Sequence, residues 1–326
     1  MNNKWYEPCE IKVLSPCAAI RKRPSIYGKN IILETDMGRD PDDLFALLYL
    51  VSAGVNIKAI TLSPGDPDQI AFAKFITKEL GLDIPIGVGK KDRDKSSLTG
   101  LHQQILENYK QPTAASPDGF GPDIIKSIKT NTGDIIQGLN LLAIGPLSSV
   151  GPAIREGVKF CRATMQGGFI GYDEHDYEVE RLDKFEGKKT VPTFNLNGDR
   201  KSGLDFIAAE FPKHFVSKNV CHTMIYDQNS HELVCSVKPK NRADELLRKF
   251  MTMYLQKHKE GKKFHDPVAA VAHFNPQICK WVQGNMYYAG GAWGFTANKE
   301  EPFQEIIVDI DREKFWQQIA SPDIGF

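Results

Sequence analysis

Four aspartates stand close together near the start of the chain: Asp36, Asp40, Asp42 and Asp43. Carboxylates packed this closely repel one another unless a cation neutralises them, and hard oxygen ligands favour Ca²⁺ or Mg²⁺ over Zn²⁺. Helix capping is the alternative, because Asp40 is a good N-cap, Pro41 is a good first helical residue, and acids suit a first turn. Capping does not account for Asp36, which ends an apolar run. A cation site and a capped helix are both open on this evidence.

Two later segments carry side chains that could serve a reaction. In the first, Asp266 can cap a helix that Pro267 opens, and His265 adds a group suited to proton transfer near neutral pH. In the second, Asn195 and Asn197 could hydrogen-bond a polyol or act as turn residues before the next helix. Each segment taken alone also fits an ordinary structural role.

The elements that must position these residues alternate between strand and helix. Apolar runs predict strands at 31–36, 57–62, 85–88, 140–144, 163–168, 220–226 and 305–310. Helical spacing predicts helices at 44–51, 69–80, 149–156, 243–257, 267–273 and 311–319. This alternation favours an α/β fold with an open, mostly parallel sheet flanked by helices. Ligands of such sheets bind beyond the carboxyl ends of the strands, where the acidic turn falls.

Composition argues against several classes of protein. The 326 residues hold 41 Lys+Arg and 41 Asp+Glu, so the net charge is zero. A neutral chain is not expected to bind nucleic acid or an anionic membrane. The six cysteines form no CxxC pair, no secretory signal is visible, and the uncharged run 135–154 is too polar to span a membrane. The sequence predicts a soluble, cytoplasmic protein.

The domain organisation is expected to be simple. Residues 1–29 have no clear period and are predicted to be an N-terminal arm, and residues 30–326 a single α/β domain. Residues 172–189 are long, charged and lie between two predicted strands, a position where active-site lids are common.

Taken in order, six segments resemble the inosine–uridine-preferring nucleoside hydrolase family. That family opens with a strand and an acidic turn written D-T-D-P-G-x-D-D, and the resemblance extends over about residues 30–320. The matching segments are Glu34–Asp43, Gly145–Ser148, Met165–Gly168, Thr193–Asp199, His265–Pro267 and Ile306–Trp316.

The resemblance implies one Ca²⁺ at the bottom of a ribose pocket. Carried over by position, the carboxylates of Asp36, Asp43 and Asp266 and the backbone carbonyl of Ile144 would be its ligands. A water on the ion would be the nucleophile, with Asp36 accepting its proton. The reaction would be hydrolysis of an N-glycosidic bond through an oxocarbenium-like transition state.

The resemblance also implies substrate-binding roles and an assembly. Asp42, Asn195 and Asp266 would hold the ribose hydroxyls, and Asp66 could accept a further hydroxyl hydrogen bond. His265 would protonate or orient the leaving base. The partner would be a small nucleoside or N-riboside, and the protein would form a homo-oligomer, because the family forms dimers and tetramers.

Two departures from the family pattern affect the expected substrate. The acidic turn has two extra residues before Asp42, and Thr193 stands at the substrate-binding position of a Glu that normally binds the 5′-hydroxyl. A substrate altered at its 5′ end, such as a nucleotide, is therefore an alternative. Four nearby residues could receive a 5′-phosphate or could be ordinary surface groups. They are Lys188, Lys189, Arg200 and Lys201.

The binding of the base and the type of chemistry are also open. Phe250, Tyr254 and Trp293 are candidates for stacking on the base, although each also fits the core. A non-catalytic nucleoside- or ribosyl-binding protein is the second functional hypothesis. An aspartyl-nucleophile phosphatase is a distant third, because that chemistry needs an Asp where Gly38 stands.

Overall fold

The computed structural model describes residues 15–22, 28–89, 98–131, 138–176 and 178–324. At its centre is a 10-stranded sheet in the order β11-β10-β12-β7-β6-β5-β1-β2-β3-β4, and β8 and β9 pair separately. The strands are β1 (Asn30–Thr35), β2 (Asn56–Leu62), β3 (Ile86–Val88), β4 (Gly119–Phe120), β5 (Asn140–Ala143), β6 (Ala163–Gln166), β7 (Lys213–Val216), β8 (Ile225–Tyr226), β9 (Lys262–Lys263), β10 (Cys279–Ala289), β11 (Ala292–Ala297) and β12 (Gln304–Ile310).

The strand order changes direction at β1. The chain steps outward from β1 through β2 and β3 to β4, then returns to β5, which pairs with the other side of β1. Eight strands from β12 to β4 are parallel, and the hairpin β10–β11 adds an antiparallel edge. The predicted open, mostly parallel sheet is confirmed. Its switch point lies between β1 and β5, where ligands of such sheets bind.

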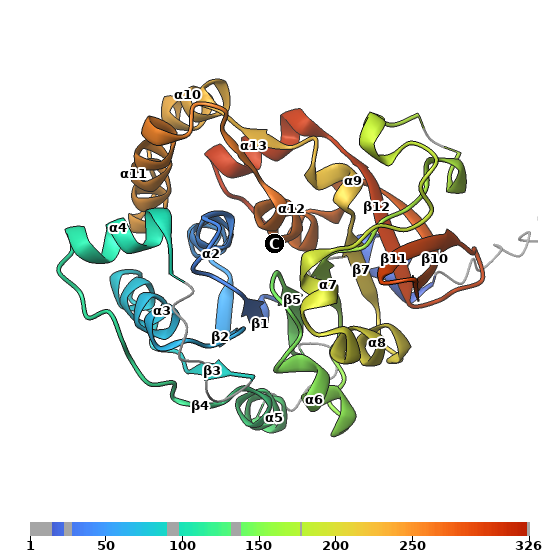
Figure 1. Ribbon diagram of the computed structural model, residues 1–326, viewed down its shortest axis with the longest axis horizontal. Helices are drawn as coiled ribbons and strands as arrows, with labels where there is room; N and C mark the ends of the chain where they lie inside the picture. The colour runs from blue at the N-terminus through green and yellow to red at the C-terminus, as the bar shows by residue number, and fades with distance from the viewer. Residues whose placement is uncertain (1–14, 23–27, 90–97, 132–137, 177, 325–326) are drawn as a thin grey trace, which may run out of the picture.

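Helices cover both faces of the sheet (Figure 1). Apolar side chains of α2, α3, α4, α10, α11, α12 and α13 form one core, and those of α5, α6 and α8 form the other. The helices are α1 (Pro16–Lys22), α2 (Asp42–Ser52), α3 (Pro67–Glu79), α4 (Gly100–Asn108), α5 (Gly121–Asn131), α6 (Val150–Arg155), α7 (Phe194–Gly198), α8 (Arg200–Ala208), α9 (Lys218–Cys221), α10 (Gln228–Ser236), α11 (Arg242–Lys257), α12 (His265–Phe274) and α13 (Arg312–Ala320), with short 3₁₀ turns η2 (Tyr172–Glu174), η3 (Asp183–Phe185) and η4 (Pro276–Ile278).

Strand β1 is buried between these two cores. Ile31 and Leu33 contribute to one core and Ile32 to the other, which explains its unbroken apolar run. Glu34 is the exception: the Thr61 hydroxyl and the Ser149 backbone N–H donate to its carboxylate, the latter at 3.2 Å. Burial raises the pKa of Glu34 to about 8. Glu34 thereby joins the ends of β1 and β2 to the start of α6.

The strand predicted at 220–226 is wrong in most of its length. Residues Lys218–Cys221 form helix α9, because the Ser217 hydroxyl accepts the Val220 N–H at 3.2 Å and caps a helical turn. The neighbouring sheet strand is β7, which the sequence analysis did not predict. The hairpin β10–β11 was also unpredicted, and Gly290 and Gly291, at φ 57° and 87°, form its turn.

Two residues of the predicted loop 172–189, Tyr172 and Phe185, pack with Phe169 and Val191 in a small apolar cluster. The Tyr172 hydroxyl accepts the Leu182 N–H at 2.8 Å, so the loop is tied to itself. Its role as a lid stays a prediction.

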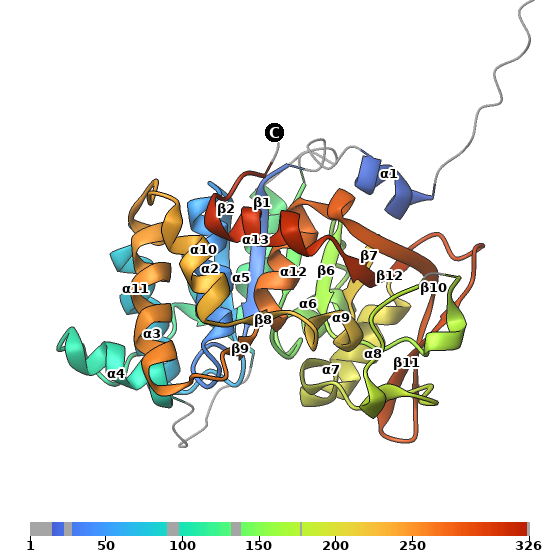
Figure 2. The same cartoon turned by 90° about the horizontal axis from the view of Figure 1, so that it is seen from above.

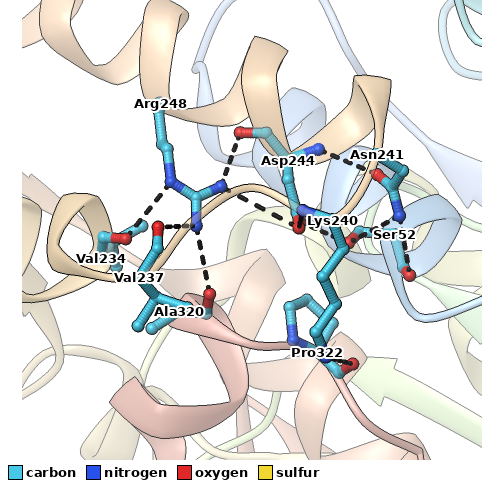
Figure 3. A network of polar contacts seen from close by, with 9 residues as sticks. All are labelled: Ser52, Val234, Val237, Lys240, Asn241, Asp244, Arg248, Ala320 and Pro322. Atoms are coloured by element: carbon cyan, nitrogen blue, oxygen red, sulfur yellow. Dashed lines mark hydrogen bonds and ion pairs between the residues drawn. The ribbon is translucent and has the colours of Figure 1, made fainter.

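Hydrogen bonds of Arg248 connect three of the outer helices. The Arg248 guanidinium on α11 donates to backbone carbonyls of Val234, Val237, Asp244 and Ala320, at 2.9 to 3.2 Å (Figure 3). It thereby joins α10, α11 and the end of α13.

In the part of the predicted arm that the structure describes, residues 16–22 form α1, which lies near β7 and β10 (Figure 2). Among the described residues no helix has the length and apolar character to cross a membrane.

Candidate active site

A cavity of about 330 Å³ opens at the switch point of the sheet. Its lining comes from the segments after β1 and β5, the end of β6, and the N-terminal turns of α2, α7 and α12. Its lining residues are Asp36, Arg39, Asp40, Asp42, Asp43, Ile144, Gln166, Phe194, Asn195, His265 and Asp266. The structure therefore brings the acidic turn together with residues more than 200 positions away.

We name Asp36, Asp42, Asp43 and Asp266 the acidic cluster. Carboxylate oxygens of Asp42, Asp43 and Asp266 lie within 4.8 Å of one another, and all three side chains are buried. Asp42 and Asp43 occupy the first turn of α2, and Asp266 the first turn of α12. Because helix N-termini favour negative charge, two helix dipoles converge on this cluster.

The acidic cluster carries more negative charge than a buried site tolerates. Burial, and then the Asp42 charge, raises the pKa of Asp36 to about 7. Burial and the neighbouring carboxylates also raise the pKa values of Asp43 and Asp266 well above their usual range. Burial and mutual repulsion therefore disfavour the fully ionised cluster in the absence of a cation. Closely spaced carboxylate oxygens with a carbonyl oxygen nearby are a donor set that fits a hard divalent cation.

The carbonyl of Ile144 is held in place from two sides. The Ile144 backbone N–H donates to the Glu34 carbonyl at 2.8 Å, and the Asn195 side-chain amide donates to the Ile144 carbonyl at 2.9 Å. The same amide lies 2.8 Å from Oε1 and 3.1 Å from the carbonyl of Gln166. Asn195 thus connects α7 to the ends of β5 and β6.

Lys262 enters the site from β9. Its ammonium lies 3.0 Å from Asp40 Oδ1 and 3.3 Å from Asp42 Oδ1, and its side chain is 11% exposed. The two carboxylates raise the pKa of Lys262, against the effect of burial. Among the described groups it supplies a fixed positive charge at the edge of the acidic cluster.

The capping interpretation of both motifs is wrong in detail. Helix α2 begins at Asp42 with Pro41 in the cap position, and Asp40 points to solvent and to Lys262. Helix α12 begins at His265, so Asp266 lies inside its first turn and Phe264 takes the cap position. Neither cap residue makes a side-chain capping hydrogen bond, so neither Asp40 nor Asp266 serves as a helix cap.

His265 lies on the cavity wall beside Asp42. Its backbone N–H donates to Asp42 Oδ2 at 3.2 Å, and its Nδ1 lies 3.9 Å from the same oxygen. Burial lowers the pKa of His265, and the Asp42 charge opposes that effect. The ring centroid of His222 lies 5.3 Å from that of His265.

Two residues proposed from the sequence as substrate contacts do not line the cavity. Asp66 is buried in the cap position of α3, one strand away from the switch point. Thr193 is buried in the cap position of α7, so the residues that follow it, Phe194 and Asn195, face the cavity instead. None of the four basic residues suggested for a 5′-phosphate lines the cavity.

The three aromatic candidates for base stacking also lie elsewhere. Phe250 and Trp293 are fully buried in the two cores, and Tyr254 stacks on His258 at 4.4 Å. Phe194 is the aromatic residue on the cavity wall, and it is 65% exposed. Phe194 directly precedes Asn195 in a segment that resembles the family pattern, and this was the sequence signal that could have identified it.

No role was predicted from the sequence for Gln166, Lys262 or His222. Gln166 stands in a segment that resembles the family pattern, so the sequence could have suggested a role for it. No sequence signal marks Lys262 or His222, because their contacts depend on how distant segments fold together.

The chain is similar to known proteins over most of its length. Residues 31–317 match the family model described as inosine-uridine preferring nucleoside hydrolase. A protein of Aquifex aeolicus (strain VF5), described as an uncharacterized protein, is 26% identical over 299 residues, covering 87% of this chain and 96% of that protein.

Solved structures share the fold at low identity. A plant nucleoside hydrolase, the PpNRh1 enzyme, matches with a TM-score of 0.67 and 18% identity, covering 90% of this chain and 99% of its own. The purine-preferring ribonucleoside hydrolase from Gardnerella vaginalis matches with a TM-score of 0.64 and 16% identity, covering 90% of this chain and 97% of its own. The type III effector protein XopQ, solved with adenosine diphosphate ribose, matches with a TM-score of 0.60 and 14% identity, covering 93% of this chain and 95% of its own.

Proposed function

Because this chain belongs to the inosine-uridine preferring nucleoside hydrolase family, we propose that it hydrolyses the N-glycosidic bond of a nucleoside or related N-riboside with Ca²⁺ as cofactor. The observation that carries the proposal is the acidic cluster at the switch point of the sheet, inside a cavity large enough for a small ligand. XopQ, a protein with this fold, was solved with a ribose-containing ligand, which supports a ribosyl substrate.

The proposed calcium ligands are the carboxylates of Asp36, Asp43 and Asp266 and the carbonyl of Ile144. All of these residues line one cavity, and the repulsion among the carboxylates is relieved by a divalent cation. When bound, the ion supplies positive charge that lowers the pKa of a nearby water molecule. Asp42 is a further candidate ligand, because its oxygens lie within 4.8 Å of those of Asp43 and Asp266.

The remaining work falls to the side chains of the cavity. Asp36 accepts the proton of the attacking water, a general-base role that a carboxylate lining the cavity can fill. Asp42, Asn195 and Asp266 hold the ribose hydroxyls, and the negative charges of the two aspartates stabilise an oxocarbenium-like transition state. His265 protonates or orients the leaving base. Asp66 and Thr193 are left out of this proposal, because neither lines the cavity.

A non-catalytic ribosyl-binding protein is the second candidate. The observation in its favour is that protein groups already satisfy part of the site. Lys262 pairs with Asp42, and the Asn195 amide occupies the Ile144 carbonyl. A site of this kind could bind a ribosyl group without activating water.

Ribose release from a panel of nucleosides and nucleoside 5′-monophosphates, with EDTA and with Ca²⁺ restored, distinguishes the two. Hydrolysis requires turnover that EDTA abolishes and Ca²⁺ restores. Binding of a nucleoside without release of ribose would instead support the second candidate.

The predicted assembly is still a dimer or a tetramer, and the predicted location is still the cytoplasm. Analytical ultracentrifugation by sedimentation checks the oligomeric state.

A further inference from the structure

Basic side chains gather beside His265, outside the acidic cluster. They come from three separate segments: Lys184 from η3, Lys218 from α9 and Lys263 from β9. We name these three lysines the basic rim. Helix α9 lies against α12 (Figure 1), and the first turn of α12 lines the cavity.

A line of contacts connects the cavity to the basic rim. His265 lines the cavity, and the His222 ring centroid lies 5.3 Å from that of His265. Lys184 Nζ in turn contacts Nδ1 of His222. His222 and Lys218 stand one helical turn apart, with the His222 N–H donating to the Lys218 carbonyl at 3.2 Å. A ligand that extends past His265 therefore meets the rim.

A buried ring holds two of these groups in position. Phe185 is 4% exposed, and the Lys184 ammonium lies 5.0 Å from its ring centroid. The His222 ring packs edge-on against the same ring at 5.5 Å. Lys184 and His222 are thus fixed against a buried aromatic, unlike lysines that extend freely into solvent.

The basic rim has no acidic partner among the described residues. No carboxylate there lies within 4.0 Å of Lys184, Lys218 or Lys263, and Lys218 Nζ instead donates to the Pro192 carbonyl at 2.9 Å. The neighbouring Lys262, by contrast, pairs with two carboxylates. Three ammonium groups are therefore gathered without local neutralisation.

The rim lysines act on one another electrostatically. Burial and the charges of Lys263 and Lys218 lower the pKa of Lys184. Burial, His265 and the rim charges lower the pKa of His222 to about 3, so it stays neutral at pH 7. A bound anion relieves repulsion of this kind, and lysines bind phosphate and carboxylate through charge-assisted hydrogen bonds.

We propose that the substrate is an N-riboside with an anionic group, and that Lys184, Lys218 and Lys263 bind that group. This inference rests on the proposed function, whose cavity it extends. The acidic cluster would repel an anionic substrate, so the rim also determines on which side of the cavity the anion lies. A phosphate on the sugar and a carboxylate on the base share the required chemistry.

Binding affinity is the direct test, because it does not depend on turnover. Titration calorimetry compares uridine with uridine 5′-monophosphate and with orotidine, which carries a carboxylate on its base. At low salt we expect at least one anionic compound to bind about tenfold or more tightly than uridine, with the difference shrinking as salt rises.

A variant pair then assigns the preference to the rim. Lys184→Met with Lys263→Met should remove most of the difference between the anionic compound and uridine. Lys238→Met, which changes an exposed lysine on the α10–α11 connection, is the matched control and should keep the difference. Because Lys184 and Lys263 are exposed, the double variant is expected to fold.

The outcomes separate this inference from the proposed function. Preference for the 5′-monophosphate places the anion on the sugar, and preference for orotidine places it on the base. Equal affinity for all three compounds, or a preference that survives the double variant, overturns the inference even if uridine is hydrolysed. Failure to hydrolyse any bound compound, with the preference intact, contradicts the proposed hydrolase and not the rim.

Discussion

At the scale of single residues, Lys262 is the counter-charge of Asp42. Asp42 is buried, and its partners are the Lys262 ammonium at 3.3 Å and the His265 backbone N–H at 3.2 Å. Removing the lysine from such a pair leaves a buried carboxylate without its counter-charge, which is strongly destabilising. Without this ion pair, Asp42 would be held less firmly in the position from which it binds a ribose hydroxyl.

We therefore expect Lys262→Met to lower kcat/KM for a nucleoside by about tenfold to a hundredfold. Lys262→Arg keeps the positive charge and should retain much more activity than the methionine variant. Steady-state kinetics on the three proteins checks this. Equal activity of Lys262→Met and wild type would show that Asp42 does not depend on the ammonium.

Phe194 is the residue we expect to stack on the base. It is 65% exposed on the cavity wall, so its replacement should not disturb the core. Stacking of a base on an aromatic ring contributes about 1–3 kcal/mol, so Phe194→Ala should weaken nucleoside binding by roughly fivefold to a hundredfold. Titration calorimetry gives the change in affinity.

The control for the effect on the core is Phe250→Ala, which replaces a fully buried phenylalanine. This change should lower the free energy of unfolding by about 3–5 kcal/mol. An unchanged nucleoside affinity in Phe194→Ala would exclude Phe194 from the base site.

The sequence predicted the acidic side chains better than their neighbours. Asp36, Asp42, Asp43 and Asp266 all line the cavity, because strand ends and helix starts place them there. The ion pair of Lys262 joins residues that are more than 200 positions apart, and no local pattern signals it. Aromatic residues are equally ambiguous, since burial and stacking require the same side chains.

At the scale of elements, α1 covers a buried polar group of the sheet. Arg21 of α1 forms an ion pair with Glu305 of β12, whose side chain is 2% exposed. His214 Nε2 lies 3.6 Å from the same carboxylate. The residues of the predicted arm that the structure describes in α1 therefore serve the fold, a role that its irregular sequence did not reveal.

Arg21→Met should lower the free energy of unfolding by about 3–5 kcal/mol, because it leaves the Glu305 carboxylate buried without its counter-charge. Chemical denaturation measures the loss. The double variant Arg21→Met with Glu305→Gln removes the charge as well and should recover part of it. A loss below about 1 kcal/mol in the single variant would mean that α1 adds little.

Elements of the parallel sheet were easier to predict than those at its edges. Buried parallel strands such as β1 and β5 are short, unbroken apolar runs. Strand β10 alternates between buried and partly exposed positions over part of its length, and its antiparallel pairing with β11 depends on a Gly-Gly turn that carries no apolar signal. Helix α9 has only four residues, too few to show a period.

At the scale of the whole molecule, buried neutral histidines make folding depend on pH. Burial lowers the pKa of His214 to about 3, and the nearby charges of Arg162 and Arg21 act in the same direction. Glu305, at 3.6 Å, Cys17 and His273 also face it. The unfolded chain takes up a proton near pH 6.5 and the folded protein does not, so stability falls as the pH drops from about 6.5 to 3.

The expected slope from one such group is at most about 1.4 kcal/mol per pH unit. His214→Gln should reduce the slope by the uptake of one proton, and denaturation at several pH values measures it. A slope that the variant leaves unchanged would show that His214 is not the group responsible.

The central claim is that the acidic cluster is a calcium site required for hydrolysis. Parallel measurement of calcium binding and ribose release in wild type and Asp36→Ala tests it most directly. Asp36→Ala removes one of several mutually repelling carboxylates, so the fold should survive, and we expect weaker calcium binding together with the loss of turnover. Calcium binding and turnover at wild-type levels in Asp36→Ala would contradict the account and leave the cluster a structural feature of two helix starts.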